Sequence, residues 1–312
     1  MKLTLNAHAK INLFLDITGR RPDGYHTITG VMQAISLADT VTLEVTEPVG
    51  MHLCVMGPRP GVAESITLTC SNPELPTDNR NLAWRAAEAF FAATGRGCRT
   101  LSIHIDKRIP AAAGMAGGST NAAAVLVGLN ELFGHPLTPE ALCAVGLKLG
   151  ADVPFCIMGG GQITEGIGES LTPIAPLPPC ELVVACGGEG VSTPAAYKAL
   201  DTLYGNFDSA AYIPRTEELK TLKSALHHGD TEGVCGSVFN LFETVILPER
   251  PVARHIKAVL LQAGAMTALM SGSGPSVFGI FRKGTGEAQK AAEALTAEGI
   301  PAWICEPVGK QA

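Results

Sequence analysis

A stretch of glycines and other small residues constrains this chain more than any other feature. Residues 110–123 read PAAAGMAGGSTNAA; they follow a segment with strand-like alternation, 100–105, and run directly into an apolar helical pattern that ends near residue 134. Glycine lets the backbone approach another group without a Cβ in the way, and it also permits positive φ. The order strand, loop, helix therefore predicts that the backbone of this loop touches something directly.

The composition of the loop indicates what that partner could be. Backbone N–H groups at a helix start, together with the positive end of the helix dipole, favour an anion such as phosphate. The small and hydroxyl-bearing residues that suit this use are Gly114, Ala116, Gly117, Gly118, Ser119 and Thr120. The stretch is neither a Walker A loop, since no G-K-[ST] follows, nor a G-x-G-x-x-G dinucleotide motif. The alternative is that the glycines only allow a helix to pack closely on a sheet.

Composition and charge narrow the class of protein. A length of 312 residues with 46% hydrophobic and 17% charged residues is typical of a globular protein with room for two domains. A net charge of −6 provides no basic stripe, so we expect a small-molecule ligand and no nucleic acid partner. No apolar run reaches the roughly 20 residues that span a bilayer, and the N-terminus alternates where a signal peptide would be continuously apolar. These features predict a cytoplasmic protein without a membrane partner.

The nine cysteines form no obvious disulfide framework or metal site. They lie at positions 54, 70, 98, 143, 156, 180, 186, 235 and 305, without a C-x-x-C pair or a histidine at zinc spacing. Buried free cysteines behave as small hydrophobic residues. We therefore interpret all nine as reduced core residues and assign no metal ligand.

The N-terminal segment is predicted to be a strand. Its odd positions from Leu3 to Leu15 are apolar, whereas Lys10 and Asn12 fall on even positions. Lys10 and Asn12 are therefore expected on the same face, directed away from the core. Residues 22–24, Pro-Asp-Gly, predict the turn that ends this strand.

The remaining chain predicts an α+β arrangement in two parts. A helix is expected over 78–95, and the Gly- and Pro-rich stretch 159–180 marks a domain junction. The second half predicts strands at 182–186, 267–270, 276–282 and 301–306, and helices at 194–204, 216–228, 231–246, 251–263 and 286–298.

Three motifs of the chain resemble those of a known superfamily. PAAAGMAGGSTNAA is similar to the P-x-x-x-G-L-G-G-G-S-S-N-A-A signature of the GHMP kinases, and the strand with Lys10 and the segment MSGSGPSVFGIF, 270–281, match two other motifs in the correct order. The resemblance implies the two-domain α+β GHMP kinase fold. Its N-terminal domain, 1–170, would have a mixed β-sheet with helices that carry the phosphate loop, and its C-terminal domain, 171–312, would be ferredoxin-like.

Within this superfamily, three stretches resemble one group, the 4-diphosphocytidyl-2-C-methyl-D-erythritol kinases of the non-mevalonate isoprenoid pathway. They are residues 7–28, 150–169 and 192–197. The resemblance implies phosphoryl transfer from ATP, accompanied by Mg²⁺, to the 2-hydroxyl of the methylerythritol moiety of a cytidine diphosphate conjugate. Two alternatives are another GHMP kinase acting on homoserine or a sugar, and a non-catalytic ligand-binding relative.

The resemblance assigns a catalytic pair, Lys10 and Asp152. A positioned carboxylate can accept the proton of an alcohol as the phosphoryl group arrives, and a lysine can neutralise the developing charge. Taken alone, Lys10 could be an exposed strand lysine, and Asp152 in GADVP could be a turn or helix-cap residue.

The resemblance also assigns the binding residues. Tyr25 and Tyr197 would stack on both faces of the cytosine, His26 would bind its edge, and Asn12 and Thr193 would be further polar substrate contacts. The ATP phosphates would be held by Pro110, Ala111, Ala112, Ala113, Gly114, Met115, Ala116, Gly117, Gly118, Ser119 and Thr120.

The chain departs from the family pattern in two places. Met115 and Ala116 stand where leucine and glycine are usual, and we expect Ala116 to be tolerated only if its φ is negative. Residues 186–191 have lost the usual proline and gained Gly188 and Glu189, so the substrate loop that leads to Thr193 is expected to differ.

Overall fold

The computed structural model describes residues 1–49, 63–207 and 212–309, and these residues form two compact units. The first unit comprises Met1–Ala9, Ala38–Ile109 and Ala116–Met158. The second comprises Lys10–Leu37, Pro110–Met115 and Gly159–Ala312. The division into domains 1–170 and 171–312 stays a prediction.

Two long strands contribute to both units. Strand β1 (Lys2–Arg20) confirms the strand predicted from the N-terminal alternation, and β2 (His26–Val49) follows the turn at Pro22–Gly24. In the first unit, β4 (Gly97–Asp106) pairs antiparallel with β2, from Thr40 opposite Asp106 to Val49 opposite Gly97. Strand β3 (Ala63–Cys70) lies parallel to β4, which gives the order β3-β4-β2-β1.

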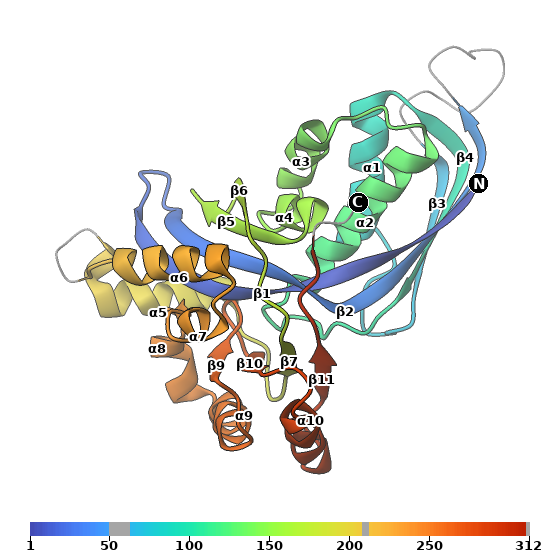
Figure 1. Ribbon diagram of the computed structural model, residues 1–312. Helices are drawn as coiled ribbons and strands as arrows, with labels where there is room; N and C mark the ends of the chain where they lie inside the picture. Colours follow the sequence, from blue (N-terminus) through green and yellow to red (C-terminus); the bar gives the residue numbers. More distant parts are fainter. Residues whose placement is uncertain (50–62, 208–211, 310–312) are drawn as a thin grey trace. The chain divides into compact units, whose positions relative to one another are not determined.

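Four helices complete the first unit: α1 (Leu82–Thr94), α2 (Gly117–Leu132), α3 (Pro139–Leu147) and α4 (Val153–Met158). The expected helix over 78–95 is confirmed as α1, whose cap is Asn81 and whose end is Gly95 with φ 65°. Apolar side chains of α1 and α2 pack on one face of the sheet, where Phe90 and Leu129 meet the alternate residues of β2 and β4 (Figure 1). This packing positions the start of α2.

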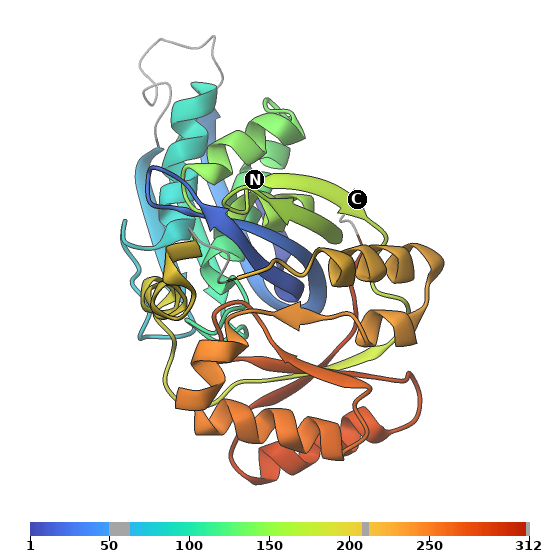
Figure 2. The same ribbon diagram turned by 90° about the vertical axis from the view of Figure 1, so that its left-hand side faces the viewer.

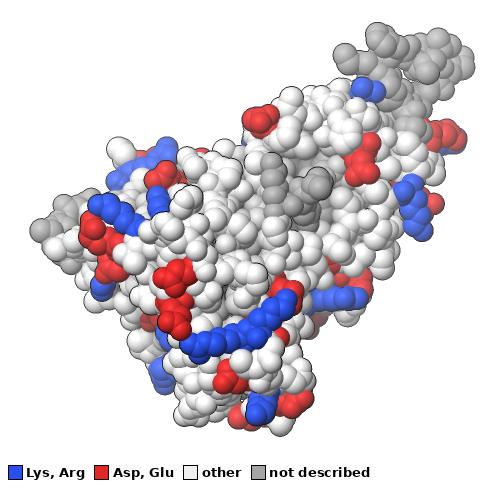
Figure 3. Space-filling model, viewed as in Figure 1, with Lys and Arg blue, Asp and Glu red and all other residues white. Residues whose placement is uncertain are grey.

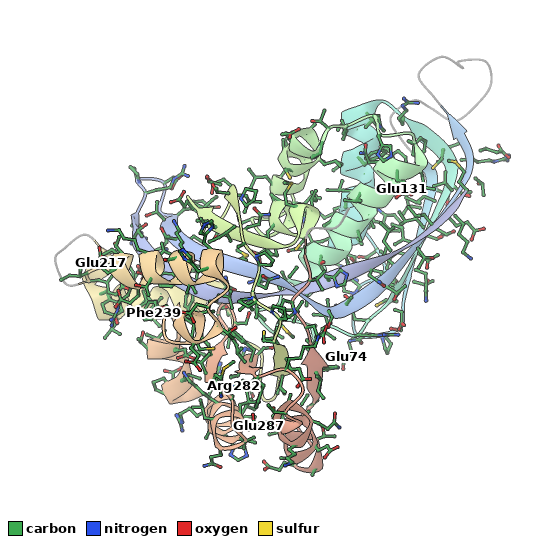
Figure 4. All side chains as sticks on the ribbon, in the orientation of Figure 1. Glu74, Glu131, Glu217, Phe239, Arg282 and Glu287 are labelled. Atoms are coloured by element: carbon green, nitrogen blue, oxygen red, sulfur yellow. The ribbon has the colours of Figure 1, made fainter. Side chains whose placement is uncertain are left out.

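In the second unit, the same two long strands receive other partners. The hairpin of β5 (Gly161–Glu165) and β6 (Ser170–Ile174) pairs with β2, Gly30 lying opposite Thr164. The two-residue strand β8 (Phe239–Asn240) runs parallel to β1, and Phe239 is labelled in Figure 4. Here residues 9–17 of β1 are buried without alternation, because Phe239 and Tyr212 cover the even-numbered side chains Phe14 and Asp16.

A second sheet in this unit has the order β11-β7-β10-β9, all antiparallel. Its strands are β7 (Glu181–Ala185), β9 (Thr267–Met270), β10 (Val277–Phe281) and β11 (Ala302–Cys305). Helices α9 (Pro251–Gln262) and α10 (Glu287–Ala297) cover one of its faces (Figure 2). The order is that of a βαββαβ ferredoxin-like domain, as predicted, with an insertion between β7 and α9.

The insertion contains α5 (Thr193–Tyr204), α6 (Thr216–His228), α7 (Thr231–Cys235) and α8 (Glu243–Ile246), with 3₁₀ turns at Gly205–Phe207 and Leu247–Glu249. The single helix predicted over 231–246 is wrong. Strand β8 interrupts it, because Phe239 and Asn240 pair with β1 instead of continuing the helical turn.

Surface charges form local pairs of opposite sign. On the face in Figure 3, Lys and Arg side chains lie among Asp and Glu side chains. On α6, for example, Lys220 contacts Glu217 at 2.7 Å and Arg215 contacts Glu218 at 2.9 Å. Exposed pairs of this kind contribute about 0–1 kcal/mol each, so the fold depends on its two cores instead.

Eight cysteines lie within the described residues, and all eight are free thiols. Only Cys98, Cys180 and Cys305 are fully buried, so the expectation of nine core positions is only partly met. Cys54 lies outside the described residues.

Candidate active site

Helix α2 begins where the glycine-rich loop ends. Ala116 immediately precedes the helix with φ 59° and ψ 27°, in the left-handed region. The expectation that Ala116 must have negative φ is therefore wrong. The chain needs a left-handed residue to turn from the loop into the helix, and alanine takes this conformation at a cost of about 1–2 kcal/mol.

The first turn of α2 presents backbone donors and little side chain. The N–H groups of residues 117–119 have no acceptor within the helix, whereas Thr120 N donates to Ala116 O at 2.9 Å. A Cβ on Gly118 would meet Leu82 at 3.5 Å, an ordinary van der Waals contact, and the residue itself is exposed. The Thr120 hydroxyl donates to His8 O at 2.7 Å and is buried, so it fixes α2 to β1. The features predicted for a phosphate site thus concentrate on Gly117, Gly118 and Ser119.

A buried aspartate holds both sides of this loop. Asp39 is fully buried, and its Oδ1 accepts hydrogen bonds from the backbone N–H of Arg108 (2.7 Å) and Ile109 (2.8 Å). Its Oδ2 accepts from Lys107 Nζ (2.5 Å) and Asn121 Nδ2 (2.8 Å). The carboxylate therefore joins the middle of β2, the chain that enters the loop and the first turns of α2.

Asp152 lies in the turn before α4, in the same unit. Its carbonyl accepts from Cys156 N at 3.1 Å, and the residue is half-buried. Two positions earlier, a Cβ on Gly150 would stand 3.9 Å from Ser119 Oγ, and α4 packs against α2. The turn that carries Asp152 therefore lies beside the start of α2, as a role near the phosphate loop requires.

Lys10 and Asn12 lie side by side on β1, in the second unit. Lys10 Nζ donates to Asn12 Oδ1 at 2.6 Å, which confirms the predicted common face. Both residues are buried, with 4% and 1% of their surface exposed, so the expectation that they point away from the core and the reading of Lys10 as an exposed strand lysine are both wrong. A lysine that is kept inside and hydrogen-bonded has the fixed position that a functional cation needs.

The segment Pro110–Met115 packs against the start of the segment 270–281, MSGSGPSVFGIF. Gly114 has φ 74°, and a Cβ on it would stand 2.2 Å from Ser271 O. Ser271 Oγ donates to Gly114 O at 3.1 Å, and Gly272 lies against the same backbone. The close neighbour of Gly114 is therefore the backbone of the turn at residues 271–274, not a helix packed on a sheet.

Three of the expected substrate-binding residues, His26, Thr193 and Tyr197, lie in or against α5. The imidazole of His26 stacks on the ring of Tyr197, with centroids 4.6 Å apart and planes inclined by 17°. Tyr25, in the adjoining turn, is 62% exposed. Thr193, the first residue of α5, shares a hydrogen bond with Ser273 through the two hydroxyl oxygens, at 3.0 Å. The structure thus brings His26 and Tyr197 together, although His26 itself lies against the ring that was expected to stack on a base.

Comparison with known proteins identifies the family. Residues 81–160 match the GHMP kinases N terminal domain, and residues 215–301 match the GHMP kinases C terminal domain. The chain belongs to the GHMP kinases. The sequence is also 43% identical, over 95% of this chain and 93% of the relative, to a 4-diphosphocytidyl-2-C-methyl-D-erythritol kinase of Alkaliphilus metalliredigens. A protein of the same name from a Synechococcus species is 44% identical over 89% of this chain and 85% of the relative.

Solved structures agree with this assignment to the GHMP kinases. A crystal structure of 4-(cytidine 5′-diphospho)-2C-methyl-D-erythritol kinase matches with a TM-score of 0.75 at 32% identity, covering 98% of this chain and all of the other. Homoserine kinase from Cytophaga hutchinsonii matches with a TM-score of 0.72 at 19% identity, covering 99% and 95%, which shows the shared fold alone. The predicted two-domain α+β GHMP kinase fold is confirmed.

Two site features escaped the sequence reasoning. Asp39 is the single acidic residue in the mostly apolar stretch AISLADTVTL, a signal that could have indicated a buried acceptor. Asp201 of α5, which binds His26, has no such signal because it lies in an ordinary amphipathic helix.

Residues 1–49, 63–207 and 212–309 contain neither a cluster of metal ligands nor a membrane-spanning helix. There, no three His, Cys, Asp or Glu side chains form a group that could hold a metal ion. No helix in these ranges is both long and apolar enough to cross a bilayer.

Proposed function

We propose that this GHMP kinase transfers the γ-phosphoryl group of ATP to the 2-hydroxyl of 4-diphosphocytidyl-2-C-methyl-D-erythritol. The observation that carries the proposal is the similarity to kinases of this name at more than 40% identity, over nearly the whole length of both chains. The open backbone at the start of α2 supports it, since a nucleotide triphosphate is an anion that such a site suits. A cytoplasmic location, expected from the sequence, remains a prediction.

The nucleotide would bind through the loop residues 110–120. The N–H groups of Gly117, Gly118 and Ser119 would contact phosphate oxygens, and the exposure of Gly118 fits that use. Mg²⁺ bound with the nucleotide would reduce the negative charge of its phosphates. Asp39 supports the same function by holding the strand that enters the loop and the helix that leaves it.

The chemical step would rely on Asp152 and Lys10. Asp152 would accept the proton of the substrate hydroxyl, because an alcohol is a weak nucleophile near neutral pH. The Lys10 ammonium would stabilise negative charge on the transferring group, and its hydrogen bond to Asn12 keeps its position.

The cytidine end of the substrate would bind near α5. Tyr25 and Tyr197 would supply the flat surfaces, His26 the contact with the base edge, and Asn12 and Thr193 further polar contacts. The exposure of Tyr25 is consistent with a ring that still has a face to offer a ligand.

An ADP-release assay over a panel of alcohols tests this proposal. We expect ADP release with the cytidine diphosphate conjugate and only background release with homoserine, mevalonate or galactose. Faster turnover of homoserine or galactose would favour another GHMP kinase activity. Binding of the conjugate without ADP release from ATP and Mg²⁺ would favour the non-catalytic alternative.

A further inference from the structure

We propose that Asp201 is a positioning residue that holds His26 against Tyr197 and thereby prepares the cytidine site. The inference rests on the proposed function, because it assumes that His26 contacts the cytidine end of the substrate. Its starting point is a hydrogen bond between His26 Nε2 and Asp201 Oδ1, with a length of 2.6 Å.

The contact is built on one face of α5. Tyr197 and Asp201 are four residues apart in this helix, so their side chains project from the same side. The His26 imidazole lies across both of them, stacked on the Tyr197 ring and hydrogen-bonded to the carboxylate. Phe207 meets the same imidazole edge-on, with centroids 5.7 Å apart. The ring cannot tilt away from Tyr197 without breaking its bond to Asp201.

The hydrogen bond to Asp201 also determines which nitrogen of the neutral imidazole carries the proton. An ionised carboxylate can only accept a hydrogen bond, so the proton between the two groups belongs to Nε2 of His26. In the neutral ring this leaves Nδ1 as the acceptor, the same arrangement by which carboxylates orient functional histidines elsewhere. The side chains of His26 and Asp201 are 8% and 16% exposed, which limits competition from water.

Asp201 also contacts the end of β1, the strand before the turn. Its Oδ2 lies 3.7 Å from Arg20 Nη1, and Arg20 Nε donates to Gly24 O at 3.4 Å. The turn is closed by Arg21 N donating to Tyr25 O at 2.7 Å. One carboxylate therefore contacts the residues on both sides of the turn that presents Tyr25.

Substitution of Asp201 tests this role through binding of cytidine 5′-diphosphate, measured by titration calorimetry. Asp201→Ala removes the acceptor, and we expect Kd for cytidine 5′-diphosphate to rise about tenfold, the loss expected for a hydrogen bond to a charged group. The Kd of a non-hydrolysable ATP analogue should stay unchanged. Asp201→Asn keeps a carbonyl that can accept from Nε2, and it should recover most of the affinity.

A matched control is available elsewhere in the same unit. His255 Nε2 contacts Glu298 Oε2, an exposed histidine–carboxylate pair between α9 and α10. Glu298→Gln should leave the Kd of cytidine 5′-diphosphate unchanged.

A double-mutant cycle with His26→Ala decides whether Asp201 acts through His26. We expect Asp201→Ala to have no further effect on Kd in the His26→Ala background. Additive effects, or an unchanged Kd in Asp201→Ala, would overturn the inference. Because the readout is binding, a wild-type chain that binds cytidine 5′-diphosphate but transfers no phosphate would contradict the proposed function and leave the inference standing. A wild-type chain that does not bind this nucleotide would overturn both.

Discussion

Gly114 and Ser271 lie so close together that a Cβ on Gly114 would stand 2.2 Å from the Ser271 carbonyl oxygen. The neighbour is backbone, so it cannot rotate away. We expect Gly114→Ala to lower the free energy of unfolding by about 1–3 kcal/mol through overpacking. The left-handed backbone at φ 74° adds about 1–2 kcal/mol. Urea denaturation of the purified variant measures the sum.

Gly134 separates the two contributions. It has φ 76°, nearly the same backbone conformation, but a Cβ there would meet nothing within 4 Å. Gly134→Ala should therefore lose only the conformational part, about 1–2 kcal/mol. Equal losses in the two variants would mean that the contact with Ser271 is unimportant.

The Asp39 carboxylate makes a second prediction about stability. Asp39→Asn turns an acceptor toward Lys107 Nζ and Asn121 Nδ2 into a donor, and it leaves the buried ammonium without its charge partner. Loss of one partner of a buried ion pair costs about 3–5 kcal/mol. Urea denaturation should show a loss of this size.

Lys107→Met in the same chain tests the cause. If the unpaired ammonium causes the loss, the double variant should be more stable than the sum of the single variants predicts. Asp23→Asn is the control, because Asp23 forms an exposed pair with Arg21 and its loss should cost less than about 1 kcal/mol. Additive effects of Asp39→Asn and Lys107→Met would contradict this account.

Local patterns predicted most helices and strands, because their residues repeat with the period of the element that they form. Strand β9 (Thr267–Met270) and helix α6 (Thr216–His228) have the predicted bounds. The helix predicted over 231–246 is wrong for a tertiary reason. The two residues of β8 pair with β1, which is distant in sequence, and the local pattern contains no sign of that pairing.

The site was less predictable than the fold. The alternation of β1 placed Lys10 and Asn12 on one face but not their burial, since the residues that cover β1 come from distant parts of the chain. The loop motif predicted a phosphate site but not that its glycines have different surroundings. A Cβ on Gly114 would clash with backbone, whereas a Cβ on Gly118 would make only an ordinary contact with Leu82.

Two alanine-to-glycine substitutions, one at the start of α2 and one inside it, should change the stability of the protein in opposite directions. Ala116→Gly should stabilise the protein by up to about 1 kcal/mol, because glycine adopts φ 59° without strain. Ala124→Gly, in the interior of α2, should destabilise it by about 1–2 kcal/mol, because glycine has a lower helix propensity and the change removes a buried methyl group. Thermal denaturation of both variants checks this, and two losses of equal size would show that Ala116 is not strained.

Buried thiols predict a loss of stability at high pH. Burial raises the pKa of Cys180 to about 12, whereas an unfolded thiol ionises near its ordinary value of 9.0. The unfolded state therefore loses its proton first, so the stabilising contribution is complete below pH 9 and declines as the pH rises toward 12. The slope is at most about 1.4 kcal/mol per pH unit.

Comparison with Cys180→Ala isolates this thiol from the other groups that titrate in the same range. The variant loses packing equally at every pH, so only the difference in slope reports on ionisation. Urea denaturation at pH 8, 9.5 and 10.5 should show a shallower decline in the variant. Parallel curves would mean that Cys180 titrates alike in the folded and unfolded states.

Asp152→Asn separates the catalytic from the structural reading of this residue. As the proton acceptor, Asp152 should contribute about 10²–10⁴-fold to turnover, so kcat should fall at least a hundredfold while the KM values for ATP and for the cytidine conjugate change little. Asparagine and aspartate cap helices about equally well, so a residue that only starts α4 would tolerate this change with normal kcat and stability. Asp106→Asn, at an aspartate that contacts Arg108 at 3.7 Å, is the control and should keep wild-type kcat. A steady-state ADP-release assay measures these values, and near-normal kcat in Asp152→Asn would remove Asp152 from the proposed chemistry.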